Sequence, residues 1–223
     1  MTRTPPADGI LAMVPREAMD PAARKLRDTY AITPDAPLVQ REFGYYCLER
    51  WYEQGLDRDA NLAEEFGYDP PGFLPLMELG WTTAGFTPAF EPTVIEDRGA
   101  HEVVRDAAGR HVLCFKGRRS GFMPEYLDHP VKDMATWESR CKWRMDPTTP
   151  QRWEGFEERM ANARGAAARG MMISQRLIGG YMYLRSLIGP EGLLYAVYDM
   201  PEVLHDCMRT WLALADAVIA RHQ

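Results

Sequence analysis

The clearest hydrophobic pattern of the chain lies within residues 169–201. An apolar run over 171–178 ends at a glycine pair, 179–180, and a run of this length next to glycines predicts a buried strand, with a buried helical turn as the alternative. Apolar residues then recur at helical spacing until Gly189 and Pro190, where proline ends the helix. A strand, a glycine turn and a helix together predict an α/β unit.

Two more helices are expected at the end of the chain, over 193–198 and over about 202–222. The longer one carries an apolar stripe at helical spacing. The stripe consists of Val203, Leu204, Cys207, Trp211, Leu214, Ala215 and Val218. This pattern predicts an amphipathic helix with one face for packing.

The N-terminal third is expected to hold short elements. We predict a helical extension within residues 1–36, with its helix over 15–30, and two short helices further on, over 47–55 and 62–66. A short strand is expected to begin at 37–39. Residues 69–92 are rich in proline and glycine, which predicts little regular structure there.

Three β-rich runs follow, at 93–95, 101–105 and 111–115. The connections between them, Asp-Arg-Gly and Asp-Ala-Ala-Gly, are short turns, too short for the crossover that joins parallel strands. We therefore predict an antiparallel β-meander over 93–117, attached to the α/β body and outside its parallel sheet. Helices are then expected over 133–145 and 153–169.

Composition limits the class of protein. The 223 residues carry a net charge of −6, which argues against a nucleic-acid partner. No run approaches the roughly 18 apolar residues of a membrane span. The four cysteines form no CxxC pair, which is typical of free thiols in the cytoplasm.

Three segments carry a resemblance to a known family. They are 48–56 (LERWYEQGL), 88–96 (PAFEPTVIE) and 123–133 (MPEYLDHPVKD), the last followed by Trp137. The order of these segments resembles the uroporphyrinogen decarboxylase superfamily, and most closely its divergent methyltransferase branch. The resemblance implies a TIM-like (β/α)8 barrel; composition by itself indicates only an α/β protein.

Such a barrel typically needs about 250 residues. We therefore expect residues 37–223 to form a partial barrel that carries the meander as an insertion. The chain is then either a truncated product or one half of a barrel that a second polypeptide completes, and a homodimer is the other assembly that we expect. Isolated activity should then be absent.

The resemblance implies transfer of a methyl group from a small methylated compound to a corrinoid or tetrahydrofolate acceptor, with zinc ligands from a missing C-terminal half. Decarboxylation of a tetrapyrrole and a non-catalytic subunit are the alternatives. The decarboxylases carry Arg-Gln-Ala-Gly-Arg-Tyr where this chain has 41–46 (REFGYY), so Tyr45 replaces the second carboxylate-binding arginine. His205 and Cys207 copy the spacing of zinc ligands but point to different sides of a helix, so we expect no metal in this chain.

Candidate binding residues follow the predicted strands, where α/β barrels place their ligands. They are Arg41, Tyr46, Arg176, Tyr181 and Arg185, and we expect them to border one concave site for a small molecule. Several have a structural alternative: Arg41 as half of an exposed ion pair, Tyr46 as a core residue, and one of the later arginines as a cover for apolar surface. Tyr181 and Tyr183 are two residues apart and cannot share a helical face, so at most one of them lines the site.

Overall fold

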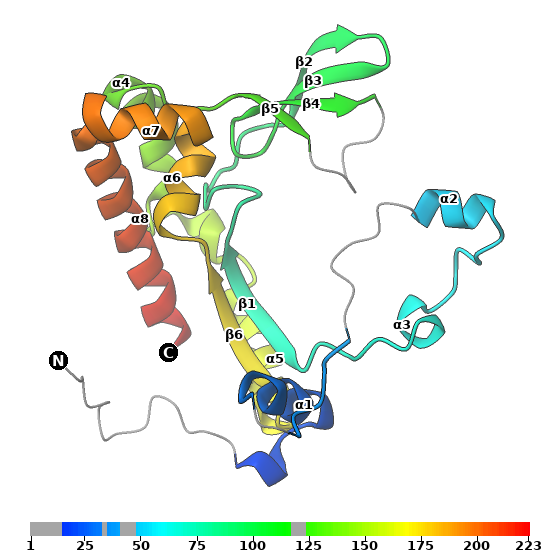
Figure 1. The fold of residues 1–223 in the computed structure, drawn as a ribbon. Helices are drawn as coiled ribbons and strands as arrows, with labels where there is room; N and C mark the ends of the chain where they lie inside the picture. Colours follow the sequence, from blue (N-terminus) through cyan, green and yellow to red (C-terminus); the bar gives the residue numbers. More distant parts are fainter. Residues whose placement is uncertain (1–14, 33–34, 41–47, 117–123) are drawn as a thin grey trace.

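The computed structural model describes residues 15–32, 35–40, 48–116 and 124–223 (Figure 1). Within these residues the protein is a mixed α/β structure with two separate sheets, one of two parallel strands and one of four antiparallel strands. The α/β class is therefore confirmed. The described residues do not form a closed barrel.

The parallel sheet pairs strand β1 (Phe73–Leu79) with strand β6 (Met172–Leu177). Leu74 lies opposite Ile173, and the register shifts once between Pro75 and Glu78. Helix α5 (Phe156–Ala168) leads into β6 and packs against both strands. β6 was predicted from its apolar run, whereas β1 lies in the segment that we expected to be irregular, and that expectation is wrong. Proline interrupts β1, which hid its apolar positions.

The antiparallel sheet is the predicted meander with one more strand. Its order is β2 (Thr93–Arg98), β3 (His101–Arg105), β4 (His111–Phe115) and β5 (Glu125–Asp128). The meander stands apart from the parallel pair, at the top of Figure 1. The prediction for 93–117 is confirmed; only β5, a four-residue strand, was not foreseen.

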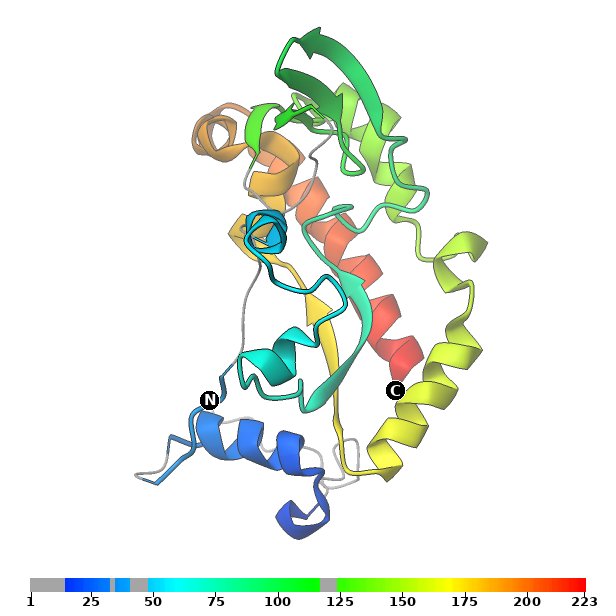
Figure 2. The ribbon, with the colours of Figure 1, turned by 90° about the vertical axis from the view of Figure 1, so that its right-hand side faces the viewer.

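Three consecutive helices follow β6: α6 (Gly180–Ile188), α7 (Pro190–Asp199) and α8 (Pro201–His222). They pack against an irregular helical segment made of α4 (Met134–Thr136), a π-helical turn at Trp137–Cys141 and a 3-10 turn at Lys142–Met145. The predicted stripe of α8 supplies much of this core, since Val203, Cys207, Leu214, Ala215 and Val218 are buried. Figure 2 shows α8 running behind the two parallel strands.

The remaining elements are short. They are the 3-10 turns η1 (Arg16–Ala18) and η4 (Pro150–Trp153) and the helices α1 (Pro21–Tyr30), α2 (Leu48–Glu53) and α3 (Leu62–Glu65). The strand predicted to begin at 37–39 is wrong, because 36–40 has no regular structure. The Gln40 carbonyl instead accepts from the Asp69 backbone N–H, and the Gln40 N–H donates to the Asp69 carboxylate, each at 2.8 Å. No helix in the described part of the chain is long and apolar enough to cross a membrane.

Candidate functional site

The carboxyl ends of β1 and β6 bring three of the five predicted site residues to one edge of the parallel sheet. Arg176 is near the end of β6, Tyr181 is in the first turn of α6, and Arg185 lies one turn later. In α/β folds ligands bind at this edge, where each strand ends and the chain continues toward a helix. Arg41 and Tyr46 lie outside the described residues.

Arg176 and Tyr181 both face solvent. Arg176 is an exposed residue whose backbone lies opposite Glu78 of β1, and it forms no ion pair with a described residue. The Tyr181 ring is 54% exposed. Tyr183, two residues later, is fully buried, and burial raises the pKa of its hydroxyl well above the ordinary value. Tyr183 is therefore a core residue, and Tyr181 is the tyrosine available to a ligand.

Arg185 reaches an aromatic residue that sequence analysis did not select. Its guanidinium lies over the ring of Trp81, 5.6 Å from the ring centre. Trp81 follows β1 directly, so it stands at the same edge of the sheet as Arg185. A guanidinium above an indole face is attracted by the negative charge of the ring face, and this contact fixes the position of Arg185.

A second arginine, Arg110, lies between Trp81 and the meander. Its guanidinium is 5.0 Å from the Trp81 ring centre and 5.1 Å from that of Tyr126. It forms an ion pair of 2.7 Å with Asp106, and its side chain is only 3% exposed. The Trp81 indole N–H donates to the Tyr126 hydroxyl at 3.2 Å. We call Trp81, Arg110, Tyr126 and Arg185 the Trp81 cluster.

The Trp81 cluster was missed because its members are far apart in the sequence. Arg110 ends a predicted turn, and an arginine there looks solvated until the meander folds against α6. The structure instead shows Arg110 donating to the Ser186 hydroxyl at 3.1 Å, across 76 positions of the chain. Arg110 is therefore already bound, to Ser186 by this hydrogen bond and to Asp106 by the ion pair. Arg176 and Arg185 are left as cations without an ion-pair partner among the described residues.

The chemistry of this edge follows from those contacts. It offers two guanidinium groups without an ion-pair partner among the described residues, one exposed tyrosine and the aromatic ring of Trp81, which Arg185 partly covers. Guanidinium groups bind carboxylates and other anions, and aromatic faces accept flat rings or methylated groups. The edge is therefore suited to a small ligand with an anionic part and an apolar part.

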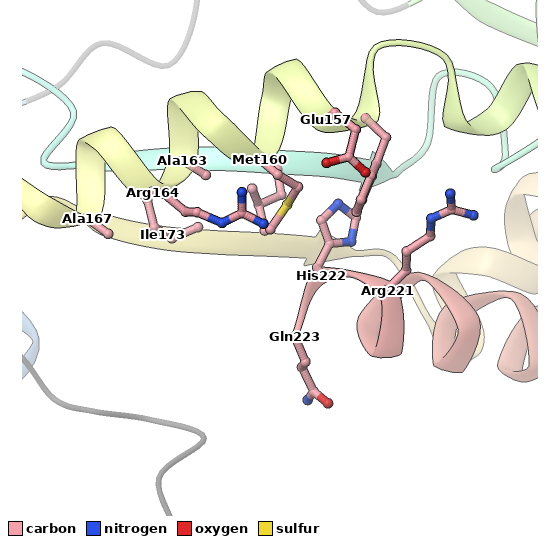
Figure 3. A pocket seen from close by; sticks show the side chains of 11 residues that line it. Glu157, Met160, Ala163, Arg164, Ala167, Ile173, Arg221, His222 and Gln223 are labelled. Atoms are coloured by element: carbon pink, nitrogen blue, oxygen red, sulfur yellow. The ribbon is translucent and has the colours of Figure 1, made fainter.

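A different hollow, of about 370 Å³, lies where the C-terminal end of α8 approaches α5 and β6 (Figure 3). His222 reaches toward α5 there, and Gln223 points away from that helix. The His222 ring packs edge-on against Phe156, with 5.4 Å between the ring centres. Arg176, Tyr181 and Arg185 do not line this hollow.

The zinc-like triplet of α8 does not form a metal site. His205 is exposed, whereas Cys207 is fully buried and burial raises the pKa of its thiol. Asp206, between them, accepts hydrogen bonds from Trp137 at 2.7 Å and from Lys142 at 2.8 Å. Within the described residues, no group of three or more His, Cys, Asp or Glu side chains could hold a metal ion.

Comparisons of the chain with models of protein families, with curated proteins and with solved structures find no match.

Proposed function

We propose that this chain contributes the small-molecule site of a barrel enzyme of the uroporphyrinogen decarboxylase superfamily, and that the enzyme transfers a methyl group from a small methylated compound to a corrinoid or tetrahydrofolate acceptor. The observation that carries the proposal is the contact of Arg185 with Trp81 at the carboxyl edge of the parallel strands. It combines a cation and an aromatic face where barrel enzymes bind substrates.

The barrel is supported by the order and direction of the elements. β1 and β6 are parallel, a helix leads into β6, and another helix follows it after a glycine pair. In the described residues, each strand of this pair has one edge that no other strand covers. Unpaired edges of this kind recruit further strands. We propose that further strands, from a second polypeptide or a second copy of the chain, close the barrel.

Methyl transfer is favoured over tetrapyrrole decarboxylation by the number of free cations. A highly carboxylated tetrapyrrole needs several arginines that each bind a carboxylate. Arg110 is already paired with Asp106, so Arg176 and Arg185 are the described cations that remain at this edge. Tyr45 also replaces an arginine of the decarboxylase motif. A small compound with one anionic group needs no more arginines than these two.

The edge formed by Arg176, Tyr181 and Arg185 is assigned to the methyl donor alone. No zinc ligand set is present among the described side chains. We therefore derive no step through the acceptor or through zinc and assign this chain the binding and orientation of the methyl donor.

The test uses the protein isolated from its native cells, with any polypeptide that accompanies it. Small compounds with an isotopically labelled methyl group are offered together with cobalamin or tetrahydrofolate, and mass spectrometry follows the label. We expect label to reach one of the two acceptors. Conversion of uroporphyrinogen to coproporphyrinogen would instead establish decarboxylation. A stable complex that is inactive in both assays would establish a non-catalytic subunit.

A further inference from the structure

A second hollow, of about 360 Å³, lies between the meander and the irregular helical segment. We call it the meander hollow. It is separate from the carboxyl edge of the parallel strands, and Arg176, Tyr181 and Arg185 do not line it. Its lining residues are Phe90, Arg105, Gly109, His111, Asp128, His129, Pro130 and Arg140. The inference drawn from it does not depend on the proposed function.

Strand pairing brings two of the polar groups together. Arg105 is the last residue of β3 and His111 is the first of β4, and the two are directly opposite in the antiparallel register. Opposite residues of an antiparallel pair project to the same face. Arg140 comes from the π-helical turn, on the other side of the hollow. Basic groups from the sheet and from the helical segment therefore face one space.

The positive charge of the two arginines is not neutralised by carboxylates. Arg105 donates to the Glu91 carbonyl at 3.1 Å and to the Thr93 hydroxyl at 3.1 Å, which orients it without an ion pair. Arg140 is exposed and forms no ion pair with a described residue. Arg140 therefore offers a bidentate donor to an anion, and Arg105 adds its charge and Nη1, since its Nε and Nη2 already donate to Glu91 and Thr93.

Asp128 is the one carboxylate that lines the hollow among the described residues. It is already paired with Lys132 and lies 3.7 Å from His111. The hollow therefore keeps a net positive charge.

The hollow also has an apolar wall. The Phe90 ring lies against the backbone of Gly109, where an added Cβ would be 2.8 Å from the ring. The guanidinium of Arg144 covers the same ring, 4.1 Å from its centre, and Pro130 extends the apolar surface. These two contacts cover part of the Phe90 ring, and the part that lines the hollow forms its apolar wall together with Pro130.

We propose that the meander hollow binds a small aromatic carboxylate, with the carboxylate held by Arg105 and Arg140 and the ring packed against Phe90 and Pro130. An aromatic acid with one ring suits a hollow of this volume, which is within the range of small-molecule sites. The carboxylate supplies the two acceptor oxygens that guanidinium groups bind in bidentate fashion.

The probe is 4-fluorobenzoate, followed by fluorine NMR on the whole chain, with 4-fluorobenzamide as the uncharged analogue. We expect the acid to bind at millimolar or lower concentration and the amide at least about tenfold more weakly, a difference of about 1.4 kcal/mol. Arg140→Gln should weaken the acid about tenfold, because it removes an exposed cation that has no other described partner. Acetate should compete only weakly with 4-fluorobenzoate, since it has a carboxylate but no ring.

Two further variants keep the test decisive. Arg105→Lys keeps the charge but loses the guanidinium that Glu91 and Thr93 orient, and it should also weaken binding of the acid. Arg98→Gln is the matched control, because Arg98 pairs with Glu96 on β2, away from the hollow, and its affinity for the acid should equal that of the wild type. Equal affinities for acid and amide, no binding of the acid at millimolar concentration, or unchanged binding in both Arg140→Gln and Arg105→Lys would overturn the proposal.

Discussion

The imidazole of His129 lies directly against the backbone of Gly189, so that a Cβ atom added at Gly189 would be 2.7 Å from His129 Nδ1. His129 follows the last strand of the meander, and Gly189 joins α6 to α7. This contact and the hydrogen bond of Arg110 to Ser186 hold the meander against the helices. The arrangement of the Trp81 cluster depends on that packing.

Substitution of Gly189 should therefore be costly. Gly189 has a φ of +93° and a ψ of 159°, a region that is almost confined to glycine, so Gly189→Ala adds backbone strain to the collision with His129. We expect a loss of at least about 2 kcal/mol in the free energy of unfolding, measured by urea denaturation.

Gly180→Ala is the matched control. Gly180 also has a positive φ, +56°, but an added Cβ there would meet nothing within 4 Å. Its loss should be only about 1 kcal/mol, the cost of a left-handed conformation. Equal losses in the two variants would show that the His129 contact does not contribute.

Lowering the pH should reduce the stability of the fold, because His129 is buried in its neutral form. Burial lowers the pKa of His129 to about 4, and the charges of Lys132 and Arg110 act in the same direction. In the unfolded chain the pKa is about 6.5, so the unfolded state binds more protons between these values and stability falls as pH drops from about 6.5 to about 4. From pH 7 to pH 5 the loss from this residue should be about 2 kcal/mol.

The measurement is urea denaturation at several pH values in the wild type and in His129→Gln, which cannot gain the proton. The wild type should lose more stability than the variant over this interval, and the difference isolates His129 from the carboxylates that also titrate. Parallel pH profiles in the two proteins would refute a neutral, buried His129.

Asp206 should behave as a structural residue of α8. It accepts from the indole N–H of Trp137, a fully buried residue, and it pairs with Lys142. Asp206→Ala leaves the buried indole N–H without its acceptor, which costs about 1–3 kcal/mol. Thermal or urea unfolding measures this loss.

Asp216→Ala, an exposed change on the same helix, should stay within about 0.5 kcal/mol of the wild type. Zinc ions added to the wild type should leave its unfolding curve unchanged, because His205 and Cys207 lie on different sides of α8. Zinc-dependent stabilisation that His205→Ala abolishes would contradict this assignment.

Local patterns predicted the elements that depend on neighbours in sequence. The apolar run before Gly179 gave β6, the short turns gave the meander, and the stripe from Val203 to Val218 gave α8. β1 was missed because Pro75 interrupts its pattern and because its pairing partner lies about a hundred residues away. Propensity near a proline carries little information about such a distant partner.

The candidate site likewise contains residues that the sequence could place and residues that it could not. Arg176, Tyr181 and Arg185 could be placed at a strand end because they follow a recognisable strand. Trp81 and Arg110 could not, since their roles arise only when β1, the meander and α6 are packed together. Burial of Arg110 against Ser186 and Trp81 is a tertiary event, and its sequence neighbourhood, including the local ion pair with Asp106, looks like an ordinary solvated turn.

The central claim is that Arg185 on Trp81 positions the methyl donor, and the labelled-methyl assay with Arg185→Gln tests it most directly. Arg209→Gln, a change of an exposed arginine on α8, is the control. We predict label in cobalamin or tetrahydrofolate with the wild type and with Arg209→Gln, and a rate at least about tenfold lower with Arg185→Gln, a loss of about 1.4 kcal/mol of transition-state stabilisation. Absence of transfer to either acceptor, or an unchanged rate in Arg185→Gln, would contradict the account.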